Sequence, residues 1–316
     1  MKELSKLAGN RRRARRPRLL HLLARGIVIV PLLALGGGGY VIWRTMEAEA
    51  ASALEFRVQI AARDASQGFA AGLLALWETD RLTRNMTDTD VSERAPDMRR
   101  RFVEMTTDLP QVSDLFILDG DRTLIRIKSD SLPLPDAVQF NSVPAVAADA
   151  PRFFVSPGVA ATSGQEVVFG LLLPRSGVTP GLRRVLGITT RSLYFEKRWL
   201  EMGLIDRDAG VSMSLVYADG RVLLGRPAIQ SSSDPAFLAA LRDNAQDGVY
   251  HRHVLNQNDA QITAYRRLDQ FPVYVVGSLT HYAVIRKFVV GMLPHLFFSF
   301  TGALVVACLR LTRRRA

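Results

Sequence analysis

Two long apolar runs lie near the ends of the chain, and shorter periodic patterns fill the region between them. Residues 26–43 contain no Asp, Glu, Lys or Arg over 18 positions, and residues 288–309 contain none over 22 positions. At about 1.5 Å per residue, helices of these lengths extend roughly 27 and 33 Å, close to the hydrocarbon thickness of a bilayer. The pattern therefore predicts two transmembrane helices.

Residues 44–86 lack proline and are rich in Ala, Leu, Glu and Arg, which predicts one long helix. Small and apolar residues recur along it at spacings of three and four, namely Leu54, Val58, Ala61, Ala65, Gly68 and Gly72. This small-residue seam can pack on a second copy of the chain or on a sheet of its own chain. A shorter helix is expected over residues 97–109, before Pro110.

Strand-like patterns begin at residue 112. Residues 112–129 form two β-rich runs joined by Asp119-Gly120-Asp121, a hairpin turn signal. Further strands are expected within residues 152–159, 166–175 and 184–190. A smaller copy of this pattern follows a connecting helix over residues 191–204, with a turn at Asp219-Gly220, a helix over 234–244 and strands over 248–256, 260–268 and 272–279. The predicted fold class is α+β, with a long helix followed by two stacked, PAS-like modules of antiparallel sheet.

The basic character of the chain is confined to its ends. The formal net charge is +11, but residues 1–25 carry +8 and residues 310–315 carry +4, which leaves −1 for residues 26–309. This distribution removes the main support for nucleic-acid binding. Basic clusters remain on the cytoplasmic side, so both termini are expected in the cytoplasm and the middle of the chain outside it. A signal peptide cleaved near residues 48–53 is the competing interpretation.

These patterns predict six segments. They are a basic cytoplasmic tail (1–25), a first span (26–44), a membrane-distal module with the long helix (45–195), a membrane-proximal module (196–286), a second span (287–309) and a short tail (310–316). The expected location is a bacterial inner membrane, with the main domain in the periplasm. Cys308 is the single cysteine and lies in the second span, so the main domain must be stabilised by its hydrophobic core.

Several stretches, in order, resemble the double Cache (double PDC) sensor regions of bacterial transmembrane receptors. They include "LPQVSDLFILDGDRTLI", "FFVSPGV" and "AYRRLDQFPVYVVGSL", and the resemblance covers roughly residues 45–285. It implies a distal module that binds a small molecule and a proximal module that passes the change to the second span. Relatives continue into a histidine kinase, a diguanylate cyclase or a chemoreceptor signalling domain. The chain is therefore expected to be a fragment of such a receptor or to act through a separate partner.

Strand alternation nominates a ligand site on one face of the distal sheet. The candidate residues are Arg126, Lys128, Arg152, Phe154, Ser156, Thr189 and Arg191. The four cations favour a small anionic ligand such as a carboxylate. Relatives that bind amino acids commonly have an acidic residue where Thr189 stands here, which favours organic acids instead. The alternative is that all seven are solvated residues of an exposed sheet face.

No cofactor, metal site or enzyme activity is expected. His251 and His253 share one strand face but lack further ligands nearby in sequence. No nucleophile motif, phosphate-binding loop or HExxH motif is present. A membrane-anchored enzyme and a structural or assembly protein that retains the sensor fold remain the rival interpretations. The small-residue seam and the two spans lead us to expect a homodimer.

Overall fold

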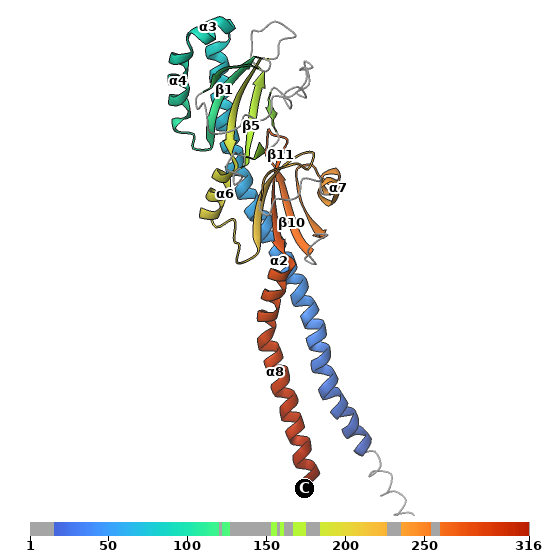
Figure 1. Ribbon diagram of the computed structural model, residues 1–316. Helices are drawn as coiled ribbons and strands as arrows, with labels where there is room; N and C mark the ends of the chain where they lie inside the picture. The colour runs from blue at the N-terminus through green and yellow to red at the C-terminus, as the bar shows by residue number, and fades with distance from the viewer. Residues whose placement is uncertain are drawn as a thin grey trace, which may run out of the picture. The chain divides into compact units, whose positions relative to one another are not determined.

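The computed structural model describes residues 16–119, 122–126, 153–156, 159–160, 167–174, 184–225, 235–253 and 260–315. The chain divides into two compact units, one formed by Ala51–His281 and the other by Met1–Ala50 with Tyr282–Ala316. Two antiparallel sheets and their helices make up the first unit (Figure 1). The predicted α+β class, with a long helix followed by two antiparallel sheets, is confirmed.

Helix α2 (Arg16–Thr83) contains the long helix expected from the sequence. The small-residue seam is buried against the sheets of its own chain. A Cβ on Gly72 would clash with Ile188, and a Cβ on Gly68 would lie 3.1 Å from the ring of Phe195. Of the two partners left open for this seam, the structure shows the chain's own sheets, because their residues already fill it.

Two short helices follow α2, namely α3 (Asp88–Glu93) and α4 (Ala95–Thr107). Helix α3 begins with a capping box, in which the hydroxyl of Thr87 accepts from the Asp90 N–H and the Asp90 carboxylate accepts from the Thr87 N–H. The Thr87 hydroxyl also donates to the Asp90 carboxylate at 2.7 Å, and this bond, followed by the one from the Thr87 N–H, lowers the pKa of Asp90. Helix α4 buries Met98 and Phe102.

The first sheet has the strand order β2-β1-β6-β5-β3, with β4 paired to β5, and every pairing is antiparallel. The strands are β1 (Val112–Asp119), β2 (Arg122–Arg126), β3 (Phe154–Val155), β4 (Val159–Ala160), β5 (Val167–Pro174) and β6 (Arg184–Arg191). One face packs on α2, where Leu171 and Ile188 approach Gly72. The opposite face carries an apolar cluster of Phe116, Leu118 and Leu172.

The second sheet has the order β8-β7-β11-β10-β9 and is also antiparallel throughout. Its strands are β7 (Val211–Tyr217), β8 (Val222–Leu224), β9 (Asp247–His253), β10 (Ala260–Arg267) and β11 (Val273–Thr280). One face packs on α2, since a Cβ on Gly277 would lie 2.6 Å from Val58. Helix α7 (Pro235–Asp243) covers the other face and places Phe237 between Tyr265 and Tyr274.

Helix α6 (Ser192–Glu201) connects the two sheets and is fastened to α2. The carboxylate of Asp64 on α2 accepts from the Nε of Arg198 and from the indole N–H of Trp199, the latter at 3.2 Å. Trp199 is fully buried. The hydrogen bond from Arg198 to Asp64 raises the pKa of Arg198. One carboxylate thus holds two successive side chains of the connector.

The second unit consists of the part of α2 up to Ala50 and of helix α8 (His281–Arg315) from Tyr282 onward. The rings of Trp43 and Phe288 meet edge to face at 5.4 Å, and Met292 packs over Gly39. Among the described helices, the segment His281–Gly302 is long and apolar enough to cross a membrane. Residues 26–43 are helical within α2, but their role as a first span stays a prediction.

The predicted division into two modules at residues 195 and 196 also stays a prediction. The connector predicted over residues 191–204 contains α6, and the two sheets lie on either side of it in sequence. However, both sheets belong to the single compact unit Ala51–His281. The long helix that they share accounts for this, since each sheet packs on the same face of α2.

We predict that Asp64→Ala lowers the free energy of unfolding by about 1–3 kcal/mol, because it leaves the buried Trp199 N–H without an acceptor. Urea unfolding of the full chain in detergent, followed by tryptophan fluorescence, measures the loss. Asp97→Ala is the control, since it removes a solvent-exposed ion pair with Arg100 and should cost about 1 kcal/mol or less. Equal losses in the two variants would contradict the role of Asp64.

Candidate functional site

The described candidate residues lie on the face of the first sheet that points away from α2. Ile188 on β6 contacts α2 at Gly72. Alternation along β6 therefore places Thr189 and Arg191 together on the face opposite Ile188. Phe154 belongs to the same face, because it packs beside the cluster of Phe116, Leu118 and Leu172.

A buried ion pair occupies this face. The Nε of Arg126 on β2 donates to the carboxylate of Asp114 on β1. The side chain of Asp114 is only 1% exposed and that of Arg126 is 16% exposed. Asp114 lies directly opposite Thr189 in the β1–β6 register. The charge of one of the four candidate cations is therefore already neutralised, because Asp114 pairs with Arg126.

Ser156 already has a structural role at the edge of the face. Its hydroxyl accepts from the Gly170 N–H at 2.7 Å, and its own N–H donates to the Gly170 carbonyl at 2.8 Å. These bonds extend the pairing of β3 with β5 beyond the end of β3. Gly170 is in turn opposite Thr189. Asp114, Thr189 and Gly170 consequently form one row across three strands.

Two polar atoms on this face are buried and have no hydrogen-bond partner within the described part of the chain. They are the hydroxyl oxygen of Thr189, a residue that is 1% exposed, and the Nε of Arg191. Most buried polar groups in native proteins are hydrogen-bonded, and leaving one unpaired costs about 1–3 kcal/mol. Arg191 also ends β6 and immediately precedes α6, with its backbone N–H bonded to the Gln111 carbonyl at 3.0 Å.

The structure brings five of the seven predicted residues to one sheet, namely Arg126, Phe154, Ser156, Thr189 and Arg191. Lys128 and Arg152 lie outside the described residues. Asp114 was missed. An acid inside the apolar run "VSDLFIL" was a signal for it, but the β-bulge between Ile117 and Leu118 changes the register with β2. The turn residues 119–121 alone therefore do not predict that Arg126 lies against Asp114.

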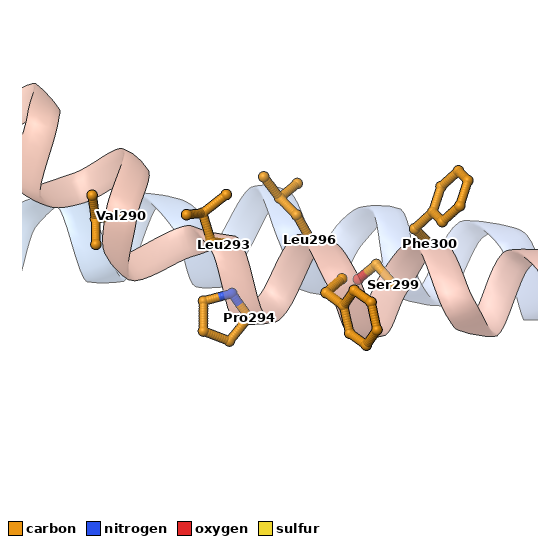
Figure 2. Close-up of a pocket in the computed structure, with 7 residues that line it drawn as sticks. Val290, Leu293, Pro294, Leu296, Ser299 and Phe300 are labelled. Atoms are coloured by element: carbon orange, nitrogen blue, oxygen red, sulfur yellow. The ribbon is translucent and has the colours of Figure 1, made fainter.

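Two hollows elsewhere are poor matches for a small anion. A groove on α8 is lined by Val290, Leu293, Pro294, Leu296, Phe297, Ser299 and Phe300 (Figure 2). It lies within the candidate membrane span, and its apolar lining offers no cation to an anionic ligand. A cavity of about 190 Å³ between α2 and the second sheet contains two carboxylates, Glu55 and Asp247, against one guanidinium, Arg266.

Among the described residues, no group of three or more His, Cys, Asp or Glu side chains could hold a metal ion. His251 on β9 is exposed, and the side chain of His253 is outside the described part of the structure. The histidine pair singled out in the sequence therefore gains no further ligand from the described residues.

We predict that Arg126→Ala lowers the free energy of unfolding by about 3 kcal/mol or more, because it removes the guanidinium that pairs with the buried Asp114 carboxylate. The double variant Asp114→Leu/Arg126→Met should recover most of this loss, since it removes both charges and keeps apolar volume. Chemical unfolding of the full chain measures both. A double variant no more stable than Arg126→Ala would show that the charge pair is not the source of the loss.

Comparison with protein families finds no matching family, and comparison with curated proteins finds no match. Solved structures do match. The extracellular domain of rpHK1S-Z16, named as a histidine kinase, has a TM-score of 0.60 and 21% identity, over 75% of this chain and 97% of that chain. The corresponding domain of soHK1S-Z6 has a TM-score of 0.56 and 10% identity, over 78% and 99%.

A third match is the ligand-binding domain of the amino-acid chemoreceptor PctB from Pseudomonas aeruginosa PAO1, in complex with L-Gln. Its TM-score is 0.50 at 13% identity, over 73% of this chain and 91% of that chain. At these identities the likeness concerns the fold. The chain thus has the fold of the extracellular sensor domains of histidine kinases and chemoreceptors, as the resemblance to double Cache regions predicted.

Proposed function

We propose that this chain senses a small molecule outside the cytoplasm and passes the change across the membrane, as the input part of a receptor. The sensor fold supports this proposal. The observation that carries it is the pair of buried, unpaired polar atoms on the distal sheet, the Thr189 hydroxyl and the Arg191 Nε. A ligand that bonded both would remove their desolvation cost.

The proposed ligand is a small carboxylate. Arg126, Lys128, Arg152 and Arg191 are its candidate cationic contacts, with Thr189 and Ser156 as hydrogen-bonding neighbours and Phe154 as an apolar wall. The Asp114–Arg126 ion pair makes Arg126 a weaker candidate than the other cations for binding the carboxylate. Since Asp114 neutralises Arg126, and the Ser156 hydroxyl is bonded to Gly170, we place the carboxylate on Arg191 and Thr189.

An uncompensated guanidinium favours a carboxylate over an ammonium group, because charge-assisted hydrogen bonds form only with the anion. The carboxylate of Asp114, which lies in the same row of the sheet as Thr189, would repel a second negative charge on the ligand. A monocarboxylate with an apolar or hydroxylated remainder therefore fits this face better than a dicarboxylate.

We predict that a carboxylate ligand at 100 times its dissociation constant stabilises the full chain by about 2.7 kcal/mol, or roughly 5–10 °C in Tm. Thermal unfolding of the chain in nanodiscs, screened against organic acids, amino acids and polyamines, measures this shift. Arg191→Ala should abolish it, because this change removes the guanidinium that binds the anion.

Arg207→Ala is the matched control for that screen. Arg207 is 65% exposed and pairs with Glu196 of α6, so its loss removes a nearby positive charge without touching the sheet face. The shift should persist in this variant. Stabilisation by cationic ligands alone, or by no ligand at all, would refute the carboxylate proposal.

The proposed receptor crosses a bacterial inner membrane twice, with both termini in the cytoplasm and the sheets in the periplasm. The candidate span in α8 and the basic ends of the chain support this topology. A cytoplasmic signalling domain or a separate partner protein would receive the signal. A cofactor or metal is not part of the proposal.

We further propose that the receptor is a homodimer, formed along the solvent-exposed face of α2. Between residues 56 and 81, the exposed residues of α2 are Phe56, Arg63, Gln67, Ala70, Leu74, Trp77 and Arg81, and Ile60 is half-buried among them. With Ile60, they recur at alternating spacings of four and three, which is the core repeat of a coiled coil. Membrane anchoring would hold two such helices parallel.

The composition of this exposed face suits a specific pair of helices. Phe56, Leu74 and Trp77 are 65%, 60% and 47% exposed, which is unusual for large apolar side chains. Arg63 and Gln67 lie between the two apolar ends. Polar residues at such core positions lower the stability of a coiled coil but fix its register.

We predict that Ala70→Cys, in a Cys308→Ser background, forms an intermolecular disulfide in native membranes under mild oxidation. Ala65→Cys is the control, since Ala65 is fully buried on the opposite side of α2 and should not cross-link. Non-reducing gel electrophoresis separates the two outcomes. Cross-linking at residue 65 alone, or at neither position, would rule out this dimer face.

A further inference from the structure

Phe271 belongs to the tight turn between β10 and β11. Two backbone hydrogen bonds close this turn, from the Leu268 N–H to the Val273 carbonyl at 2.8 Å and from the Phe271 N–H to the Leu268 carbonyl at 3.1 Å. The Pro272 carbonyl also accepts from the Ala218 N–H at 2.9 Å, which ties the turn to the end of β7. A displacement of Phe271 must therefore displace both strands.

The ring of Phe271 does not pack within its own sheet alone. It meets the ring of Phe153 at 4.9 Å and the ring of Phe69 on α2 at 5.0 Å, and its side chain is 98% buried. Phe153 directly precedes β3 of the first sheet. The turn of the second sheet thus contacts the backbone segment that carries Phe154 and Ser156, two residues of the candidate site.

The other end of this hairpin leads to the membrane segment. β11 ends at Thr280 and α8 begins at His281, with no intervening loop residue. β11 is also the central strand of the second sheet, paired to β7 and β10 along its length. A shift at the turn is therefore carried along a hydrogen-bonded strand to the first residue of α8.

We propose that Phe271 is a positioning residue that couples the candidate site on the first sheet to the β10–β11 hairpin and thereby to α8. The inference deepens the proposed function, since it names the contact through which that site would act. Ligand contacts that move β3 change the packing of Phe153 on Phe271. The buried β10–β11 turn then moves with Phe153, because the closely packed rings of Phe153 and Phe271 cannot separate without leaving a cavity.

The expected size of the coupling follows from the ring contacts. An aromatic pair contributes about 0.5–1.5 kcal/mol beyond its buried area, which corresponds to about a two- to twelvefold change in an equilibrium constant. A disturbance of β3 should therefore change local opening of the hairpin by a factor in this range.

The test disturbs β3 without any ligand. Ser156→Ala removes the hydroxyl that accepts from Gly170. We expect amide hydrogen exchange of residues 262–276 to rise about two- to tenfold in the full-length Ser156→Ala chain in detergent, measured by mass spectrometry. In a Phe271→Ala background, Ser156→Ala should cause no further rise in these amides.

Phe237→Ala supplies the matched control background. Phe237 is equally buried and belongs to the second sheet's own cluster with Tyr265 and Tyr274, remote in its contacts from Phe153. Ser156→Ala should still raise exchange in the hairpin of that background. If Phe271→Ala does not fold, Phe271→Leu replaces it, because leucine keeps apolar volume but lacks the ring.

The inference is overturned if Ser156→Ala leaves exchange of the hairpin unchanged in the otherwise native chain. It is also overturned if the rise is equal in the Phe271→Ala and Phe237→Ala backgrounds. Because no ligand is used, a failed ligand screen would count against the proposed function while leaving this coupling in place. A failed exchange test would conversely refute the coupling through Phe271 without counting against the proposed ligand binding.

Discussion

The whole unit Ala51–His281 depends on close packing between one face of α2 and two separate sheets. Gly72 admits Ile188 of the first sheet, and Gly277 of the second sheet admits Val58 of α2. Each of these glycines lies where a Cβ would collide with a neighbour, so backbone and side chain approach more closely than other residues permit. Both sheets therefore share one helix as a common support and belong to one compact unit.

This shared helix explains why so few connections are needed between the sheets. Helix α6 is their covalent link, and Asp64 fixes it to α2 by accepting from Arg198 and Trp199. Phe69 extends the contact, since it lies against Phe169 of the first sheet and Phe271 of the second. The two sheets are therefore connected by packed side chains as well as by α6.

The electrostatics of the candidate site differ from those of a simple cationic cluster. The buried carboxylate of Asp114 engages Arg126, and this pair has a largely structural role because either charge alone would be costly to bury. The Thr189 hydroxyl and the Arg191 Nε are the buried polar atoms on this face that lack a partner within the described residues. They adjoin the start of α6, so the site and the connector meet at one residue.

The sequence alone determined the order and type of the elements, because apolar periodicity and turn residues are local properties. It correctly predicted the long helix, the strand pairs around Asp219-Gly220, the connector and the sensor fold. The tertiary structure decided which partners meet. The small-residue seam faces its own sheets, a β-bulge sets the register beside Arg126, and Asp114 becomes a buried counter-ion. These outcomes depend on packing between segments far apart in sequence, which periodicity does not encode.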